Sequence, residues 1–171
     1  MNSTQRKGLL LIKLSESTKS QFGKVDFEKQ PMPQKVFSAL WTLMSEVGNG
    51  GFWQYFANSS AETAYFAVEA LQIIGAHKTA EVTQQAINVA FPDGLPKDYE
   101  DIRAVANAHL EEKYRSLLQV RKATRQFSAD VMHQLNDLDN SFYQCPDELD
   151  DLLFDFVQCH PEEFGSVSEI T

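Results

Sequence analysis

The sequence predicts an all-α fold, a single compact domain of six to seven helices with an acidic helical pair at its C-terminal end. Three observations support this prediction. Apolar residues recur at three- and four-residue spacing through most of the chain, which is the period of an amphipathic helix. Clusters of Gly and Pro at residues 48–51 and 92–96 separate these segments. No segment alternates with the period of two that is typical of a half-buried strand.

The first half of the chain is predicted to contain an arm and two helices. Residues 1–30 are polar and rich in Lys and Ser, which predicts an N-terminal arm with at most a weak helix over residues 9–14, ahead of a helical domain over residues 31–171. Apolar spacing then predicts a helix over residues 36–47, which ends at the glycine-rich residues 48–51 because Gly and Asn accept left-handed backbone conformations. The aromatic residues 52–56 are expected to form a short, deeply packed helix.

Three longer helices are predicted next. Residues 61–74 are apolar on almost every side, as expected of a central buried helix, and Asn58, Ser59 or Ser60 can cap it. Residues 79–91 carry one apolar face and end at the Pro- and Gly-rich break. Asp98 can then cap a long helix that extends to about residue 127.

The acidic pair completes the predicted fold. Ser128 is expected to open the first helix of the pair, whose apolar stripe includes Leu135 and Phe142. Pro146 suits the first turn of the second helix, which has a clean apolar face over residues 149–157.

The charge distribution is strongly asymmetric. All fifteen Lys and Arg residues lie at or before Arg125, whereas residues 126–171 contain eleven of the 24 acids and no Lys or Arg. The formal charge of −9 therefore divides into a body of +2 (15 basic, 13 acidic residues) and an acidic end of −11. Such an end points to a partner that is cationic, or one that normally holds an anion such as nucleic acid. It excludes direct binding of nucleic acid through this end, because phosphates need Lys and Arg.

The acids of the last helices are the candidate binding residues. Asp147, Asp151 and Asp155 recur every four residues, which predicts a ladder of carboxylates on the face opposite the core. Like charges at this spacing repel by roughly 0.2–0.5 kcal/mol per pair, and we expect no nearby Lys or Arg to offset this repulsion. We nominate as partner-binding residues Asp137, Asp139, Asp147, Asp150, Asp151, Asp155, Glu162 and Glu163.

Known metal and catalytic motifs are absent from the sequence. Residues 137–148 begin like a calcium-binding loop, but Phe142 occupies the sixth position, where the turn needs Gly. The four His residues are far apart, so neither a metal nor a cofactor is predicted, and a binding protein is favoured over an enzyme. An enzyme remains a third reading, with a site around Trp53, Gln54, Tyr55 and His77.

Two features bear on the compartment. The longest early apolar run covers only residues 9–12, which is too short for a secretion signal or a membrane span. The two cysteines, Cys145 and Cys159, suit a reducing environment. The sequence therefore predicts a soluble cytoplasmic protein without a membrane contact.

Residues 46–59, and within them Asn49-Gly50-Gly51-Phe52-Trp53-Gln54-Tyr55-Phe56, resemble the signature of a bacterial DNA-mimic protein family of neisserial type. Weaker matches occur at residues 74–76, 91–92, 138–143 and 160–164. The resemblance implies an all-helical homodimer with acidic patches laid out like DNA phosphates. It also implies a partner that is a basic DNA-binding protein of helix-turn-helix type, which the mimic keeps off its operator.

One departure from that family keeps an alternative open. A DNA mimic should present negative charge over a broad surface, yet the first 125 residues are slightly basic. The alternative is a helical protein-interaction module that binds an unknown partner without DNA mimicry. Ionic strength distinguishes the DNA mimic from the interaction module, because binding through acids weakens as ionic strength rises, whereas apolar docking persists. The lysines that depart from a DNA surrogate are Lys7, Lys13, Lys19, Lys24, Lys29 and Lys35.

Overall fold

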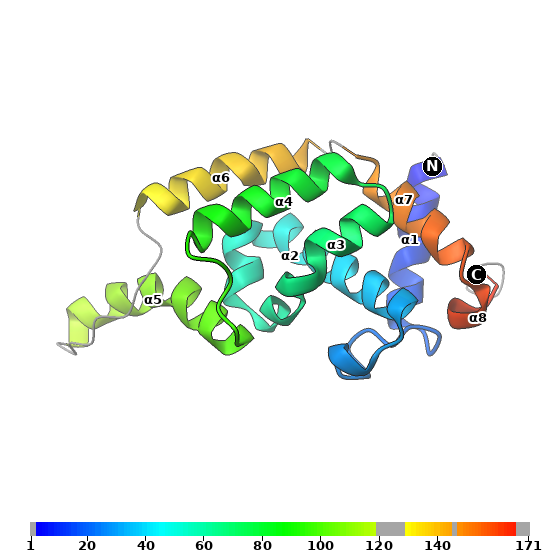
Figure 1. The fold of residues 1–171 in the computed structure, drawn as a ribbon, viewed down its shortest axis with the longest axis horizontal. Coiled ribbons are helices and arrows are strands. Elements are labelled where there is room, and N and C mark those ends of the chain that lie inside the picture. The colour runs from blue at the N-terminus through cyan, green and yellow to red at the C-terminus, as the bar shows by residue number, and fades with distance from the viewer. Residues whose placement is uncertain (1–2, 119–128, 145–146, 167–171) are drawn as a thin grey trace.

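The computed structural model describes residues 3–118, 129–144 and 147–166, and confirms the all-α prediction. These ranges contain eight α-helices and two 3₁₀ helices and no strand (Figure 1). The α-helices are α1 (Ser3–Glu16), α2 (Met32–Ala57), α3 (Ala64–Ile73), α4 (His77–Ala90), α5 (Tyr99–Leu118), α6 (Ala129–Tyr143), α7 (Leu149–Gln158) and α8 (Pro161–Phe164). The 3₁₀ helices are η1 (Phe27–Lys29) and η2 (Ser59–Thr63).

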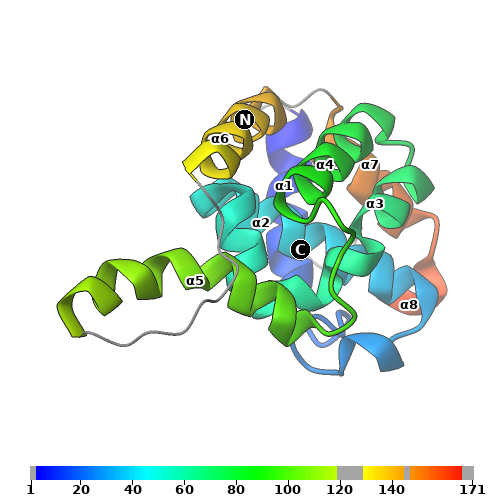
Figure 2. The same ribbon diagram turned by 60° about the vertical axis from the view of Figure 1, so that its left-hand side comes forward.

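Helix α2 lies at the centre of the molecule and contacts α3, α5, α6 and α7. Helices α4 and α6 lie side by side along one side of the molecule in both views (Figures 1 and 2). Because the first part of α2 is surrounded, its apolar residues Phe37, Leu40 and Leu43 are fully buried. A helix that packs against neighbours on several sides needs apolar residues on most of its surface, which explains the composition of this part of α2.

The predicted break at residues 48–51 is a kink within α2 rather than a loop. Gly50 (φ −155°) and Gly51 (φ 77°) leave helical geometry, and the aromatic residues continue as the second part of the helix. Phe52, Tyr55 and Phe56 are fully buried, as predicted. Phe52 meets Phe142 of α6 edge-to-face at 5.6 Å between ring centroids, so the kink places the aromatic cluster against α6.

The start of the predicted helix at residues 61–74 is different in the structure. Residues Ser59–Thr63 form η2, and α3 begins only at Ala64. The Ser60 hydroxyl donates to the carbonyl of Tyr55 and the Thr63 hydroxyl donates to the carbonyl of Ser60. Because these hydroxyls bond to nearby carbonyls, they favour the tighter turn over a regular helical start.

Helices α4 and α5 follow the sequence prediction closely. Helix α4 begins two residues earlier than predicted, at His77. Asp98 caps α5 as expected, because its Oδ1 accepts the Glu100 N–H at 2.9 Å. The predicted end of this helix near residue 127, and the predicted roles of Ser128 and Pro146, lie outside the described residues.

The two ends of the chain pack against each other. The predicted weak helix over residues 9–14 belongs to the longer α1, which packs on α7 and buries Leu11 and Leu14 to 1% exposure each. The buried Gln34 side chain accepts the Gln21 N–H and donates to the carbonyl of Glu163. This amide joins the segment after α1 to α8, a short helix that the sequence pattern did not predict.

Candidate acidic interface

The eight nominated acids fall into two groups, those exposed to solvent and those engaged inside the fold. Asp137 on α6 has 70% of its side chain exposed, and its Oδ2 lies 4.0 Å from His133 Nε2. Glu162 is exposed at the start of α8. Asp155 on α7 has 61% of its side chain exposed. These three carboxylates are presented to solvent from three successive helices.

Asp139 holds the kink of α2 together. It is half-buried, and its Oδ1 accepts the Phe52 N–H at 2.7 Å. This N–H lies at the start of the second part of α2, where the first backbone donors of a helix lack internal partners. A Cβ at Gly51 would lie 2.2 Å from Asp139 Oδ2, so the approach requires glycine. Burial raises the pKa of Asp139, and the hydrogen bond from Phe52 opposes that rise.

Asp147 caps another helix and does not belong to the acidic ladder. It precedes α7, and its Oδ2 accepts both the backbone N–H of Thr79 at 2.8 Å and the Thr79 hydroxyl at 3.0 Å. The residue at the N-cap of α4 is Ala76, which has no side-chain acceptor, so Asp147 supplies the cap from a distant segment. The prediction that Asp147, Asp151 and Asp155 form one ladder opposite the core was therefore wrong.

The acids of α7 face helix α1. The Lys7 ammonium lies 3.1 Å from Asp155 Oδ1 and 3.5 Å from Asp151 Oδ1, and 5.5 Å from the centroid of the Phe154 ring. Lys7 and Asp155 are 148 residues apart in the sequence, so the local charge pattern gave no sign of this ion pair. The hydrogen bond that Lys7 donates to Asp155 is the largest cause that raises the pKa of Lys7. The prediction that no cation offsets these carboxylates was wrong.

Asp150 lies between α7 and α1 without a cationic partner of its own in the described part of the chain. Its Oδ2 would be 2.9 Å from a Cβ at Gly8, so a glycine in α1 allows the close approach of the two helices. Burial raises the pKa of Asp150, and the neighbouring charges of Asp151 and Glu148 raise it further. Asp150 is thus a half-buried carboxylate that ionises less readily than an exposed Asp.

Glu163, the last nominated acid, is half-buried in α8. Its backbone carbonyl is the acceptor that ties this helix to Gln34. The residues that sequence reasoning missed as neighbours of the acids are Lys7, Gly8, Gly51 and Thr79. A signal for Thr79 is that α4 begins without a capping residue of its own.

The residues considered for an enzyme are engaged elsewhere. The Trp53 indole N–H donates to the carbonyl of Ala106, and Gln54 donates to Glu46. The Tyr55 hydroxyl is fully buried against Thr63, and this burial raises the pKa of Tyr55. His77 is exposed at the start of α4. His77 lines a cavity with Gln72 and Glu81, and Trp53, Gln54 and Tyr55 are not part of its lining.

Two absences hold for the residues that the structure describes. No three His, Cys, Asp or Glu side chains in those ranges are grouped so that they could hold a metal ion. Among the same residues, every helix is too short or too polar to cross a membrane.

Residues 28–160 match the family model described as DMP19-like protein. The chain belongs to the DMP19-like family. This is a family of DNA mimics, and the match covers the central helix, the aromatic kink and the acids of α6 and α7. Comparison with proteins of curated function and with solved structures gave no match.

The DMP19-like region does not include α1. Residues 3–16, and with them Lys7, precede the matched range, and α8 follows it. Asp151 and Asp155 lie inside the DMP19-like region, whereas the cation that pairs with them lies outside it.

Proposed function

We propose that this protein is a non-enzymatic DNA mimic that occupies the basic surface of a DNA-binding protein and blocks its binding to DNA. The observation that carries the proposal is the set of exposed acids on α6, α7 and α8 in a chain of the DMP19-like family. In this hypothesis the partner is a transcription factor of helix-turn-helix type, and the mimic acts in the cytoplasm as a homodimer. Two-fold symmetry would then set the spacing of the two acidic patches.

The contacts inside the fold divide the nominated acids by role. Asp137, Asp155 and Glu162 are exposed and are the first candidates for contact with Lys and Arg of the partner. Exposed Asp130 lies seven residues before Asp137 on α6 and extends the same face. Rigid helices hold these carboxylates at fixed separations, which is what imitation of the spaced phosphates of a duplex requires.

The remaining acids contribute less directly. Asp139 and Asp147 cap helix starts, so their loss is expected to disturb the fold as well as the surface. Asp150, Asp151 and Glu163 are half-buried, and they add to the negative field of the region without full access to a partner.

The test uses two variants with the same change in charge. The first carries Asp130→Asn, Asp137→Asn and Glu162→Gln, which neutralise exposed acids of α6 and α8. The matched control carries Glu69→Gln, Glu81→Gln and Asp101→Asn, which neutralise exposed acids of α3, α4 and α5. Each protein is immobilised and exposed to nuclease-treated lysate at low and at high salt. Captured proteins are identified and then tested for displacement from DNA in a gel-shift assay.

We expect a DNA-binding protein that is captured at low salt and released at a few hundred millimolar salt, because the Debye length shortens to roughly 5 Å in that range. The first variant should lose this capture and the control should keep it. Capture that both variants retain at high salt would refute the mimic, as would a captured protein that remains on its DNA.

A second candidate function rests on a different surface. Leu9 and Ile12, one turn apart on α1, are 48% and 44% exposed. An apolar pair on an outer helix face is consistent with a helical protein-interaction module that has no mimicry. Under this alternative, Leu9→Ser with Ile12→Ser abolishes capture of the partner, and the neutralised acids make no difference.

A further inference from the structure

Helix α1 covers the acidic side of α7. Figure 1 shows the two helices side by side, at the end of the molecule opposite α5. The Lys7 ammonium lies against the carboxylates of Asp151 and Asp155. Asp150 lies against Gly8, since a Cβ at this glycine would be 2.9 Å from its Oδ2. The first helix of the chain therefore contacts three acids of α7 at once.

This contact leaves two of the three carboxylates poorly satisfied. The distances from Asp151 to the Lys7 ammonium and to the Thr4 hydroxyl are each 3.5 Å, longer than the roughly 2.7–3.2 Å of a good hydrogen bond. Asp151 Oδ1 is buried and has no hydrogen-bond partner among the described residues. Asp150 is half-buried, and burial raises its pKa. A partner with several N–H groups would satisfy these oxygens better than α1 does.

Helix α1 has little internal stability of its own. It has 14 residues, close to the roughly 12–15 below which an isolated helix is marginal in water. Gly8 lies in its interior and lowers its helix propensity, and its first turn has no acid to complement the helix dipole. Its fully buried apolar side chains are Leu11 and Leu14. The helix therefore depends on its contact with the rest of the protein.

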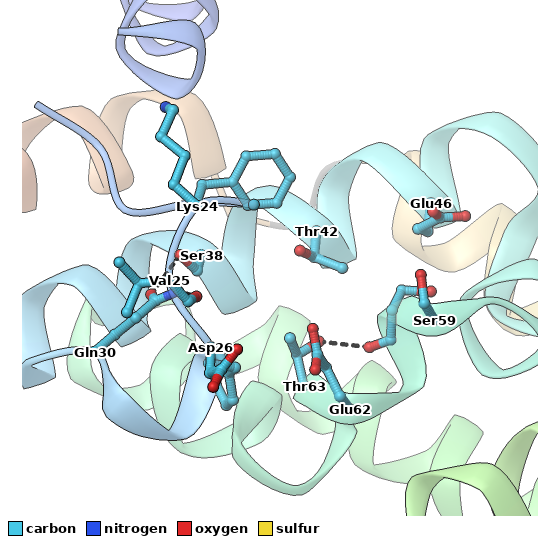
Figure 3. Close-up of a pocket in the computed structure, with 14 residues that line it drawn as sticks. Lys24, Val25, Asp26, Gln30, Ser38, Thr42, Glu46, Ser59, Glu62 and Thr63 are labelled. Atoms are coloured by element: carbon cyan, nitrogen blue, oxygen red, sulfur yellow. Dashed lines mark hydrogen bonds between the residues drawn. The ribbon is translucent and has the colours of Figure 1, made fainter. Parts of the chain in front are cut away.

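The chain that follows α1 is anchored separately. The Gln34 side chain on α2 donates to the carbonyl of Lys19 at 3.0 Å and accepts the Gln21 N–H. Lys24 donates to carbonyls at the end of α1 and just after it, that of Ser17 at 2.7 Å. Figure 3, which looks into a polar cleft lined by this segment, shows the amine of Lys24 beside the ribbon of α1. The C-terminal end of α1 is thus a fixed pivot, and the helix can swing away from α7 without displacing α2.

We propose that α1 is an autoinhibitory segment that covers the acidic side of α7 and opens it to a cationic partner when it swings away. The device rests on the proposed function, because its partner is the same cationic DNA-binding protein. While α1 is docked, the partner reaches the exposed acids of α6 and α8. Once α1 has left, the partner also reaches Asp150, Asp151 and Asp155. The DMP19-like region, residues 28–160, contains these three acids and lacks α1.

Hydrogen exchange of the isolated full chain, followed by NMR, tests whether α1 opens independently. We expect the amides of Leu11 and Leu14 to be protected at least about tenfold less than those of Phe37 and Leu40 in α2, because α1 opens without global unfolding. Equal protection in the two helices would mean that α1 leaves only when the whole protein unfolds. That result would overturn the proposal.

Two variants with the same side-chain change test whether α1 controls access to the acids. Leu11→Ala removes a side chain that is 1% exposed, and Leu9→Ala removes one that is 48% exposed. The probe is a fluorescent, blocked hexa-arginine peptide, and its binding at low salt is followed by anisotropy. We expect Leu11→Ala to tighten binding about tenfold or more, because the apparent Kd falls as the open fraction rises, and Leu9→Ala to leave it unchanged.

Two results of this comparison would refute the proposal. Equal affinity of Leu11→Ala and Leu9→Ala for the peptide would show that α1 does not control access. Loss of the whole fold in Leu11→Ala, followed by circular dichroism, would show that α1 belongs to the folding unit. Exchange in the unchanged chain decides the same question without any substitution.

A second pair of substitutions places the gained affinity on α7. In the Leu11→Ala background, Asp151→Asn with Asp155→Asn should abolish the tighter binding. The matched control, Asp130→Asn with Asp137→Asn on α6, removes the same charge and should keep the ratio between Leu11→Ala and the unchanged Leu11. A gain that survives the α7 substitutions would refute the proposal.

These measurements use the isolated protein and a synthetic peptide. A pull-down that captures no DNA-binding protein would therefore remove the proposed function without changing the exchange rates or the peptide affinities. Conversely, equal protection of α1 and α2 would remove the autoinhibitory segment and leave the exposed acids of α6 and α8 available to a partner.

Discussion

Substitution of Gly51 by Ala tests whether Asp139 is a structural cap or a free acid of the interface. Gly51 has φ 77° and ψ −178°, a backbone conformation that is almost restricted to glycine. Its position next to the Asp139 carboxylate makes the added methyl group a steric probe of this contact. Two separate costs follow, one for the backbone and one for the displaced carboxylate.

The magnitude can be estimated from these two costs. A non-glycine residue in this backbone region costs about 1–3 kcal/mol. A Cβ at 2.2 Å from Asp139 Oδ2 forces the carboxylate away, so the 2.7 Å bond to the Phe52 N–H is lost. Loss of such a helix cap costs about 0.5–2 kcal/mol. Gly51→Ala should therefore lower the free energy of unfolding by about 1.5–5 kcal/mol, a large part of the roughly 5–15 kcal/mol of a typical domain.

A double-mutant cycle in urea, followed by far-UV circular dichroism, isolates the contact. In the Asp139→Ala background no carboxylate remains to be displaced, so Gly51→Ala should cost only the backbone term. We expect a coupling energy of about 0.5–2 kcal/mol between the two positions. Additivity within about 0.3 kcal/mol would show that Asp139 does not hold the kink and is instead a free acid of the interface.

Three further predictions concern the acids of the second half. Asp147→Ala removes the cap of α4 and should lower the urea midpoint by an amount equivalent to about 1 kcal/mol, with faster hydrogen exchange at Thr79. Lys7→Met should lower the melting temperature at low salt but not at high salt, because salt screens the ion pair with Asp155. The control Lys13→Met, at an exposed position, should leave the melting temperature unchanged at both salt concentrations. A loss of stability that does not depend on salt would mean that packing matters and charge does not. The fold raises the pKa of Asp150, so its ionised form opposes folding above that pKa. Asp150→Asn should therefore stabilise the protein at pH 7, and this gain should shrink as pH falls through the folded pKa and be absent below 3.8, the unfolded value.

The sequence was sufficient for most of the helices because their apolar spacing and glycine breaks are local signals. Residues 48–51 indicated a break, and the structure has a kink there within α2. Two elements were beyond a local argument. Helix α1 is mostly polar, and it extends to 14 residues because Leu11 and Leu14 are buried by packing within the fold. Helix α8 has only four residues, too few for any periodic pattern.

The acidic site was predicted less well because charge along a sequence says nothing about distant partners. Asp139 and Phe52 are 87 residues apart, and Asp147 and Thr79 are 68 apart. In both pairs the donor is a backbone N–H near a helix start, which carries no charge for a sequence pattern to show. The clue lies in the missing caps, since Gly51 and Ala76 offer no side-chain acceptor to the helices that they precede. At these two helix starts a distant Asp provides the missing acceptor.

The contact of α1 with α7 sets how much negative charge a partner can reach. Lys7 already neutralises part of the charge of Asp151 and Asp155, so a Lys or Arg of the partner must compete with it at this face. No such competition exists at Asp137 or Glu162, which have no Lys or Arg partner in the described part of the chain. If the DNA-mimic proposal holds, Lys7→Met therefore separates two docking modes. It should tighten a complex formed through α7 and leave a complex formed through α6 and α8 unchanged, because only the first mode must displace the ammonium.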